Sequence, residues 1–178
     1  TFLAGLLIDK FAYHLPLYRI HQRLAFGGIT ISRGTLTYLV HAAGNLLEPV
    51  YKAQVKSVLG GHRISVDETP IKVRKENKES LQRGYYWPVY GDQDEIVFHY
   101  ADTRAAKVLD ELLKGFKGVL LTDGYAAYDK YAAKVREIIH ALCWTQTRRE
   151  FIEAEGSEPA RVTRALDLIG KLYETEAE

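Results

Sequence analysis

Two aspartates that follow short apolar runs are the residues of this sequence best placed to do chemistry. Asp67 comes directly after Ile-Ser-Val at residues 64–66, and Asp123 comes after Gly-Val-Leu-Leu-Thr at residues 118–122. Pro70 lacks a backbone donor, so we expect the first run, interpreted as a strand, to end before it. An acid at a strand end suits metal binding. It also suits a plain turn, because Asp readily bonds its own backbone.

The pattern changes from helical to sheet-like at residue 61. Alternating, β-branched and aromatic runs predict three sequential antiparallel strands at residues 64–66, 84–90 and 95–100. The elements predicted after them are a helix at 102–116, a buried strand at 118–122, a helix at 125–133 and a strand at 135–143. A right-handed crossover would place the fourth strand parallel beside the first. The predicted fold class is α/β, with a mixed five-stranded sheet flanked by helices.

This topology would bring the two aspartates together. Neighbouring strands lie about 4.8 Å apart, and the carboxyl ends of parallel strands meet at one edge, so Asp67 and Asp123 would face one crevice. Two ionised carboxylates repel each other, and a divalent cation removes that cost. Oxygen ligands without cysteine favour Mg²⁺ or Mn²⁺, and two such ions would support phosphodiester displacement with Asp67 as the bridging ligand. Alternatively, Asp123 caps a helix entry and Asp67 only turns the chain.

Residues 1–60 carry helical periodicity and no strand pattern. Apolar spacing predicts one helix at the start of the chain, a second from Pro16 and a third with Ser32 as its N-cap. Pro49 should kink or restart the third helix, which makes residues 51–59 a separate stretch.

The second and third helices, joined by a glycine-containing turn, are similar to a helix-turn-helix. Arg19, Arg23 and Arg33 would then contact DNA phosphates. A helical hairpin that merely packs is the alternative.

Composition narrows the class of protein further. Hydrophobic residues make up 47%, charged residues 26%, and the net charge is +1, so no global basic field indicates nucleic acid. Cys143 is the single cysteine, which excludes an intramolecular disulfide and a cysteine zinc cluster.

The absence of a long apolar run predicts a cytosolic protein without a membrane partner. Because the chain begins at Thr1 and contains no Met, we expect a fragment. A charged run at 74–83 predicts a solvated loop.

Several phrases resemble, in order and spacing, the transposases of insertion sequence 66. They are Val-Asp-Glu-Thr-Pro-Ile-Lys-Val at 66–73, Gly-Tyr-Tyr-Trp at 84–87, Gly-Val-Leu-Leu-Thr-Asp-Gly-Tyr-Ala-Ala-Tyr at 118–128, and Cys-Trp at 143–144 followed by Arg148 and Arg149. The phrases at 14–18 and 31–36 fit the same family, so the resemblance covers nearly the whole chain.

The resemblance implies a ribonuclease H-like core that cuts and joins DNA with an Asp-Asp-Glu triad and Mg²⁺ or Mn²⁺. Asp67 matches the first acid and Asp123 the second, while Arg148 and Arg149 are DNA contacts. The implied partners are DNA at the element ends and target, further copies of the chain, and accessory proteins encoded by the element. The implied location is the bacterial cytoplasm, at the nucleoid.

The resemblance also sets the expected segments. They are a helical, helix-turn-helix-like segment at 1–60, a partial catalytic core at 61–156, and a helix at 157–178 that starts the family's helical insertion.

Two departures from the family pattern leave other functions open. The family's third acid is a Glu in an Asn-rich Glu-Arg segment, and none occurs up to residue 178, so this fragment alone should be inactive. Gln146 stands where the family has His, and an amide cannot exchange a proton as imidazole does. One alternative is a non-catalytic DNA-binding or assembly remnant. Another is a ribonuclease H-like nuclease that uses Glu150 or Glu153 as the third ligand.

Overall fold

The computed structural model describes residues 1–75 and 79–176. It divides into two compact units, Thr1–Gln54 and Val55–Glu178. The predicted loop at 74–83 falls partly outside the described residues, at 76–78, and its last two residues belong to a strand.

The first unit is helical, as the periodicity predicts. Its elements are α1 (Phe2–Leu7), the π-helix η1 (Ile8–Ala12), α2 (Leu17–Phe26) and the first part of α3 (Arg33–Leu59). Leu6, Ile20 and Leu36 are buried together and form its core. The cap at Ser32 is confirmed, because its Oγ accepts a hydrogen bond of 3.0 Å from the Thr35 N–H.

The prediction that Pro49 divides the third helix is wrong. Pro49 lies inside α3, which is assigned as one helix of 27 residues. A proline within a helix costs roughly 3 kcal/mol, because one backbone hydrogen bond is lost. Burial at both ends of the helix offsets this cost, since Leu36 lies in the core of the first unit and Val58 in that of the second.

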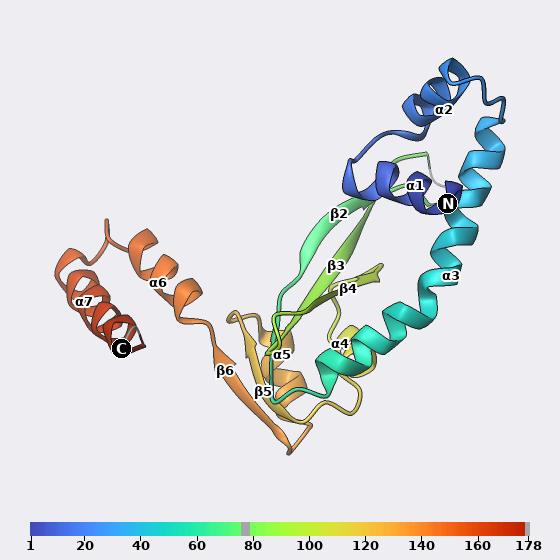
Figure 1. Cartoon of the computed structure of the whole chain (residues 1–178). Helices are drawn as coiled ribbons and strands as arrows, with labels where there is room; N and C mark the ends of the chain where they lie inside the picture. Colours follow the sequence, from blue (N-terminus) through green and yellow to red (C-terminus); the bar gives the residue numbers. More distant parts are fainter. Residues whose placement is uncertain (76–78, 177–178) are drawn as a thin grey trace. The chain divides into compact units, whose positions relative to one another are not determined.

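The second unit is built on a mixed sheet (Figure 1). Its strands are β1 (Arg63–Val66), β2 (Thr69–Val73), β3 (Gln82–Gly91), β4 (Ile96–Ala101), β5 (Gly118–Thr122) and β6 (Ile138–Leu142). β3 pairs antiparallel with β4 along one edge and with both β1 and β2 along the other. β5 lies parallel to β1, and β6 parallel to β5. The parallel fourth strand is therefore confirmed.

The sheet has six strands rather than five because a further strand, β2, follows the predicted strand at 64–66 after a short break. β1 ends at Val66 and β2 begins at Thr69, so the break falls at Asp67 and Glu68. The prediction that Pro70 ends the strand is wrong, since Pro70 lies within β2 and opposite Tyr85. Among the described residues, only β3 pairs with β2. Pro70 is tolerated there because its missing donor costs no ladder bond on the unpaired edge.

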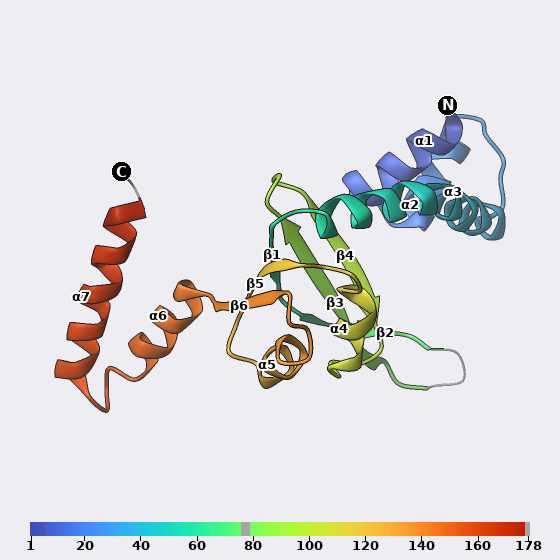
Figure 2. The same ribbon diagram turned by 90° about the horizontal axis from the view of Figure 1, so that it is seen from below.

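The core of this unit lies against one face of the sheet. Ile64, Trp87, Val89 and Leu120 point from the strands into a buried cluster. The last turns of α3, together with α4 (Lys107–Leu112) and α5 (Ala126–Ala132), supply the covering residues, and Figure 2 shows α4 and α5 on the same side of the sheet. Side chains alternate along a strand, so the neighbouring positions point to the other face. That face carries exposed apolar side chains, among them Tyr86, Tyr90, Phe98 and Ile139.

Two further helices follow the sheet, α6 (Trp144–Glu153) and α7 (Pro159–Glu176), and they pack against each other. Thr145 and Tyr173 join them through a hydroxyl pair at 3.3 Å. Helix α4 is shorter than the predicted 102–116. It begins at Lys107, because Thr103 bonds the Ala105 N–H in a turn before the helix instead of capping it.

Candidate metal centre

Asp67 and Asp123 lie level with each other at the carboxyl ends of two adjacent parallel strands. Ser65 of β1 is in register with Leu121 of β5. Asp67 follows Ser65 by two residues, and Asp123 follows Leu121 by two residues, so the two aspartates lie at the same height. With Glu68 they form a group in which one carboxylate oxygen of each residue lies within 4.8 Å of one oxygen of each of the others. The predicted meeting of the two aspartates is therefore present in the structure, and the third carboxylate is one that sequence reasoning missed.

A local backbone bond orients each aspartate. The Glu68 N–H donates to Asp67 Oδ1 at 2.8 Å, and the Tyr125 N–H donates to Asp123 Oδ1 at 2.9 Å. These are the bonds that a turn aspartate makes, so both side chains do shape the chain locally. Each bond engages Oδ1 and leaves Oδ2 free to bind a cation.

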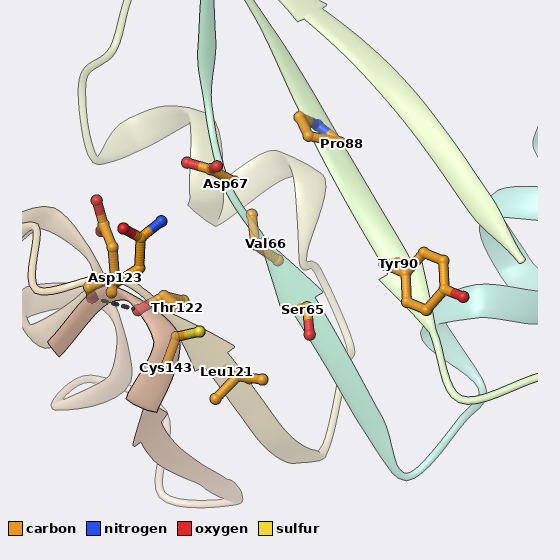
Figure 3. Close-up of a pocket in the computed structure, with 10 residues that line it drawn as sticks. Ser65, Val66, Asp67, Pro88, Tyr90, Leu121, Thr122, Asp123 and Cys143 are labelled. Carbon is orange, nitrogen blue, oxygen red and sulfur yellow. Dashed lines mark hydrogen bonds between the residues drawn. The ribbon is translucent and has the colours of Figure 1, made fainter. Parts of the chain in front are cut away.

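The aspartates open onto a pocket of about 190 Å³ (Figure 3). Its walls are apolar or neutral and include Pro88, Leu121 and Cys143. Gln146, from the first turns of α6, also lines the pocket, so the position where the family carries His faces the candidate metal centre. The pocket therefore combines two carboxylates at one end with walls that carry no competing charge.

Glu68 is buried, with only 2% of its side chain exposed, and both of its carboxylate oxygens have partners. Oε1 accepts from the Arg104 guanidinium, and Oε2 accepts from the Tyr128 hydroxyl. Burial raises the pKa of the Glu68 carboxyl above its usual range, although the bonds from Tyr128 and Arg104 act in the opposite direction. The sequence holds one indirect signal for this residue, a second acid at the strand break, but its partners are 36 and 60 residues away.

Arg104 joins Glu68 to the helix that follows the second aspartate. Its guanidinium carbon lies 3.9 Å from the centre of the Tyr125 ring, a close cation–π contact. The Tyr125 hydroxyl in turn donates to the Arg104 carbonyl at 3.2 Å. Burial lowers the pKa of Arg104, but the bond and charge of Glu68 outweigh that effect and raise it overall, so the guanidinium stays charged.

Tyr128 packs beneath the site and is fully buried, with its ring edge-to-face against both Trp87 and Tyr125. Burial and the bond to Glu68 raise the pKa of the Tyr128 hydroxyl far above its usual range, so it acts only as a neutral donor.

A second hydrogen-bonded chain supports the strand ends from the β6 side. The Thr122 hydroxyl lies 2.8 Å from His140 Nε2, and His140 Nδ1 lies 3.1 Å from an Asp129 carboxylate oxygen. Thr122 Oγ1 also lies 2.8 Å from the Asp123 carbonyl oxygen, to which it can donate. This chain fixes the backbone of the second aspartate to β6 and α5.

The arginines predicted to contact DNA have different surroundings. Arg148 and Arg149 are exposed on α6, and Arg149 donates to Gln146 at 3.3 Å. In the helical unit, Arg19 and Arg33 are exposed, whereas Arg23 forms an ion pair with the buried Asp9. Arg23 therefore has a structural partner within its own unit.

Glu150 and Glu153 are exposed on α6. Across the described residues, neither belongs to the carboxylate group formed by Asp67, Glu68 and Asp123.

The fold and site together indicate a class of protein. An antiparallel part, made of β1 to β4, is followed by β5 and β6, which run parallel to β1. Asp67 follows the end of β1, and Asp123 follows the end of β5. This arrangement is compatible with the ribonuclease H-like fold. The family model described as Transposase IS66 family matches residues 1–178, so the chain belongs to that transposase family.

Three curated relatives come from Sinorhizobium fredii. The uncharacterized protein y4jD is 28% identical over 191 residues, which cover 98% of this chain and 37% of the relative. The uncharacterized protein y4qI is 28% identical, and the alignment covers 85% of this chain and 31% of the relative. The uncharacterized protein y4hP is 30% identical, and the alignment covers 85% of this chain and 29% of the relative. The chain thus spans about a third of the length of the relatives it matches. Across the described residues, no helix combines the length and apolar character that a membrane crossing requires.

Proposed function

We propose that Asp67 and Asp123 are the first two acids of a divalent-metal site that cuts and joins DNA at the ends of an insertion element. The observation that carries the proposal is the level placement of the two carboxylates at adjacent parallel strand ends. Membership of a transposase family gives the reaction its class.

The donor set fits Mg²⁺ or Mn²⁺. The donors are carboxylate oxygens within 4.8 Å of one another, without a cysteine or histidine in the group. Both oxygens of Glu68 are engaged by protein donors, so the ligands would be Asp67 and Asp123. When bound, a pair of such ions supplies activation of the attacking oxygen and stabilisation of the leaving oxygen in phosphodiester displacement.

The chain's own residues hold and orient these ligands. The amides of Glu68 and Tyr125 fix one oxygen of each aspartate, and the second oxygen of each would bind the cation. Arg148 and Arg149, both exposed, would contact backbone phosphates, where a planar guanidinium binds two oxygens at once. Arg19 and Arg33 would add phosphate contacts from the helical unit.

The family resemblance puts the third carboxylate, a Glu, beyond residue 178. We therefore assign DNA cleavage and strand transfer to the full-length protein, acting as a homo-oligomer on element ends and target. Residues 1–178 alone would bind metal without turning over. The proposed segments remain a helical DNA or partner contact at 1–60, a partial catalytic core at 61–156, and the start of an insertion at 157–178.

The test is strand cleavage by the full-length protein in Mn²⁺ on DNA that carries the element ends. Asp67→Asn and Asp123→Asn should each reduce cleavage by at least about 10³-fold, because an amide cannot replace the charge of a carboxylate that would hold the cation. Glu150→Gln and Glu153→Gln are the matched controls, acids of the same chain outside the cluster, and should retain activity. Full cleavage by either aspartate variant contradicts the proposal, and loss of cleavage in a glutamate variant favours the nuclease alternative.

A further inference from the structure

We propose that Arg104 is a positioning residue that couples the two acids of the metal centre through Glu68 and Tyr125. The inference rests on the proposed function, because it concerns how Asp67 and Asp123 are held for a cation. Arg104 itself touches neither aspartate in any described hydrogen bond. It contacts the residue that follows the first aspartate and the residue that orients the second.

The first half of the coupling acts at the break between β1 and β2. Asp67 and Glu68 fall between β1 and β2, outside the ladder pairs on either side, and the Asp67 N–H reaches the Pro88 carbonyl only at a long 3.4 Å. The sheet therefore holds this dipeptide weakly. The Glu68 side chain fixes it instead, since the ion pair to Arg104 and the bond from Tyr128 anchor both carboxylate oxygens. The Glu68 amide that orients Asp67 is anchored with it.

The second half acts at the start of α5. Tyr125 gives its N–H to Asp123, gives its hydroxyl to the Arg104 carbonyl and holds its ring 3.9 Å from the Arg104 guanidinium carbon. Backbone and side chain of Arg104 thus contact the same tyrosine. One arginine fixes both amides that orient the metal-binding carboxylates.

Charge supports the same role. Three carboxylates within 4.8 Å repel one another when all are ionised. The Arg104 guanidinium neutralises the charge of Glu68. The two negative charges that remain are those of Asp67 and Asp123, which would bind the cation. Arg104 is 42% exposed at its side chain, so its loss opens no large core cavity, and its effect on the metal centre can be separated from loss of the fold.

The experiment measures Mn²⁺ affinity by isothermal titration calorimetry on the 178-residue chain, with thermal unfolding recorded for each variant. Arg104→Ala should weaken Mn²⁺ binding by about 10- to 100-fold, the usual cost of removing an outer support of metal ligands. Arg104→Lys should weaken it less, because it keeps the charge and loses the planar fork and the stacking. Lys117→Ala is the matched control, since it removes an exposed ion pair with Glu137 elsewhere in the unit and should leave the affinity unchanged.

Hydrogen exchange in the metal-free chain gives a second readout. The Glu68 and Tyr125 amides should exchange at least about ten-fold faster in Arg104→Ala, with core amides of β3 unchanged. The double variant Arg104→Ala with Glu68→Gln should bind Mn²⁺ no more weakly than Arg104→Ala alone, because both changes break the same link. If Arg104→Ala fails to fold, Arg104→Lys and Glu68→Gln decide the outcome by the same two readouts.

Two results overturn the inference and leave the proposed function intact. One is wild-type Mn²⁺ affinity and amide exchange in the folded arginine variants. The other is strong loss of affinity in Glu68→Gln without any loss in Arg104→Ala, which would make Glu68 a ligand. The proposed function fails separately if the wild-type chain binds Mn²⁺ no better than Asp67→Asn and Asp123→Asn.

Discussion

The bond between Tyr128 and Glu68 gives the sharpest test of the packing beneath the candidate metal centre. Tyr128→Phe removes one hydroxyl from a fully buried ring and leaves Glu68 Oε2 without its donor. A hydrogen bond to a buried charged group contributes about 1.5–3 kcal/mol, and we expect a loss of roughly 2–3 kcal/mol at pH 7 in the metal-free chain. For a chain of this size, that loss lowers the Tm by roughly 4–12 °C.

The pH dependence has a definite sign. Burial raises the pKa of Glu68 in the folded chain above its value in the unfolded chain, so the folded state holds the Glu68 proton more tightly. The free energy of unfolding therefore falls as pH rises from the pKa of Glu68 in the unfolded chain, about 4.3, to its higher pKa in the folded chain. Above the folded pKa, the contribution of Glu68 to stability no longer changes with pH. Tyr128→Phe removes a bond that lowers this pKa. The destabilisation by Tyr128→Phe should be larger at pH 7 than at pH 4, because a larger fraction of the Glu68 carboxyl is protonated at the lower pH.

Tyr131→Phe is the control, on the same helix. Its hydroxyl donates to the uncharged Leu113 carbonyl at 3.0 Å in an equally buried setting. Its loss should cost about 1 kcal/mol, with little change between pH 4 and pH 7. Urea unfolding of both variants at the two pH values measures the difference. Equal destabilisation by the two variants at both pH values would refute the role assigned to Tyr128.

Further predictions concern metal, backbone and surface. Saturating Mn²⁺ at about 100 times its Kd should stabilise the chain by roughly 2.7 kcal/mol, and Asp123→Asn should abolish this shift in thermal unfolding. Gly118→Ala should cost about 3 kcal/mol or more in urea unfolding, because φ is +140° and the new Cβ would clash with the His62 carbonyl oxygen. Arg23→Ala should lower the Tm of the chain as well as any DNA affinity, since Asp9 loses its partner, and an unchanged Tm would contradict that pairing.

The sequence predicts the parts of the fold that depend on local pattern. The strand periods, the crossover and the acids at the ends of two strands are enough to place Asp67 beside Asp123, because strand polarity fixes which ends meet. The effects predicted for Pro49 and Pro70 are wrong for two different reasons. Pro49 loses a backbone bond inside α3, and burial at both ends of that helix offsets the cost. Pro70 lies in β2, where its missing donor costs no ladder bond on the unpaired edge.

The support around the site could not be predicted. Glu68 reads as an ordinary turn acid beside Asp67, and nothing in a single sequence links it to Arg104 or Tyr128, which are 36 and 60 residues distant. Such long-range pairs arise from the way α5 and the segment before α4 pack on the sheet.

The most direct measurement of the central claim is Mn²⁺ binding by the 178-residue chain, followed by electron paramagnetic resonance of the bound ion. The account predicts that the wild-type chain binds Mn²⁺, that Asp67→Asn and Asp123→Asn each weaken binding by at least about ten-fold, and that Glu150→Gln leaves it unchanged. Mn²⁺ bound with equal affinity by the wild type and both aspartate variants would contradict the assignment of the two aspartates as a metal centre.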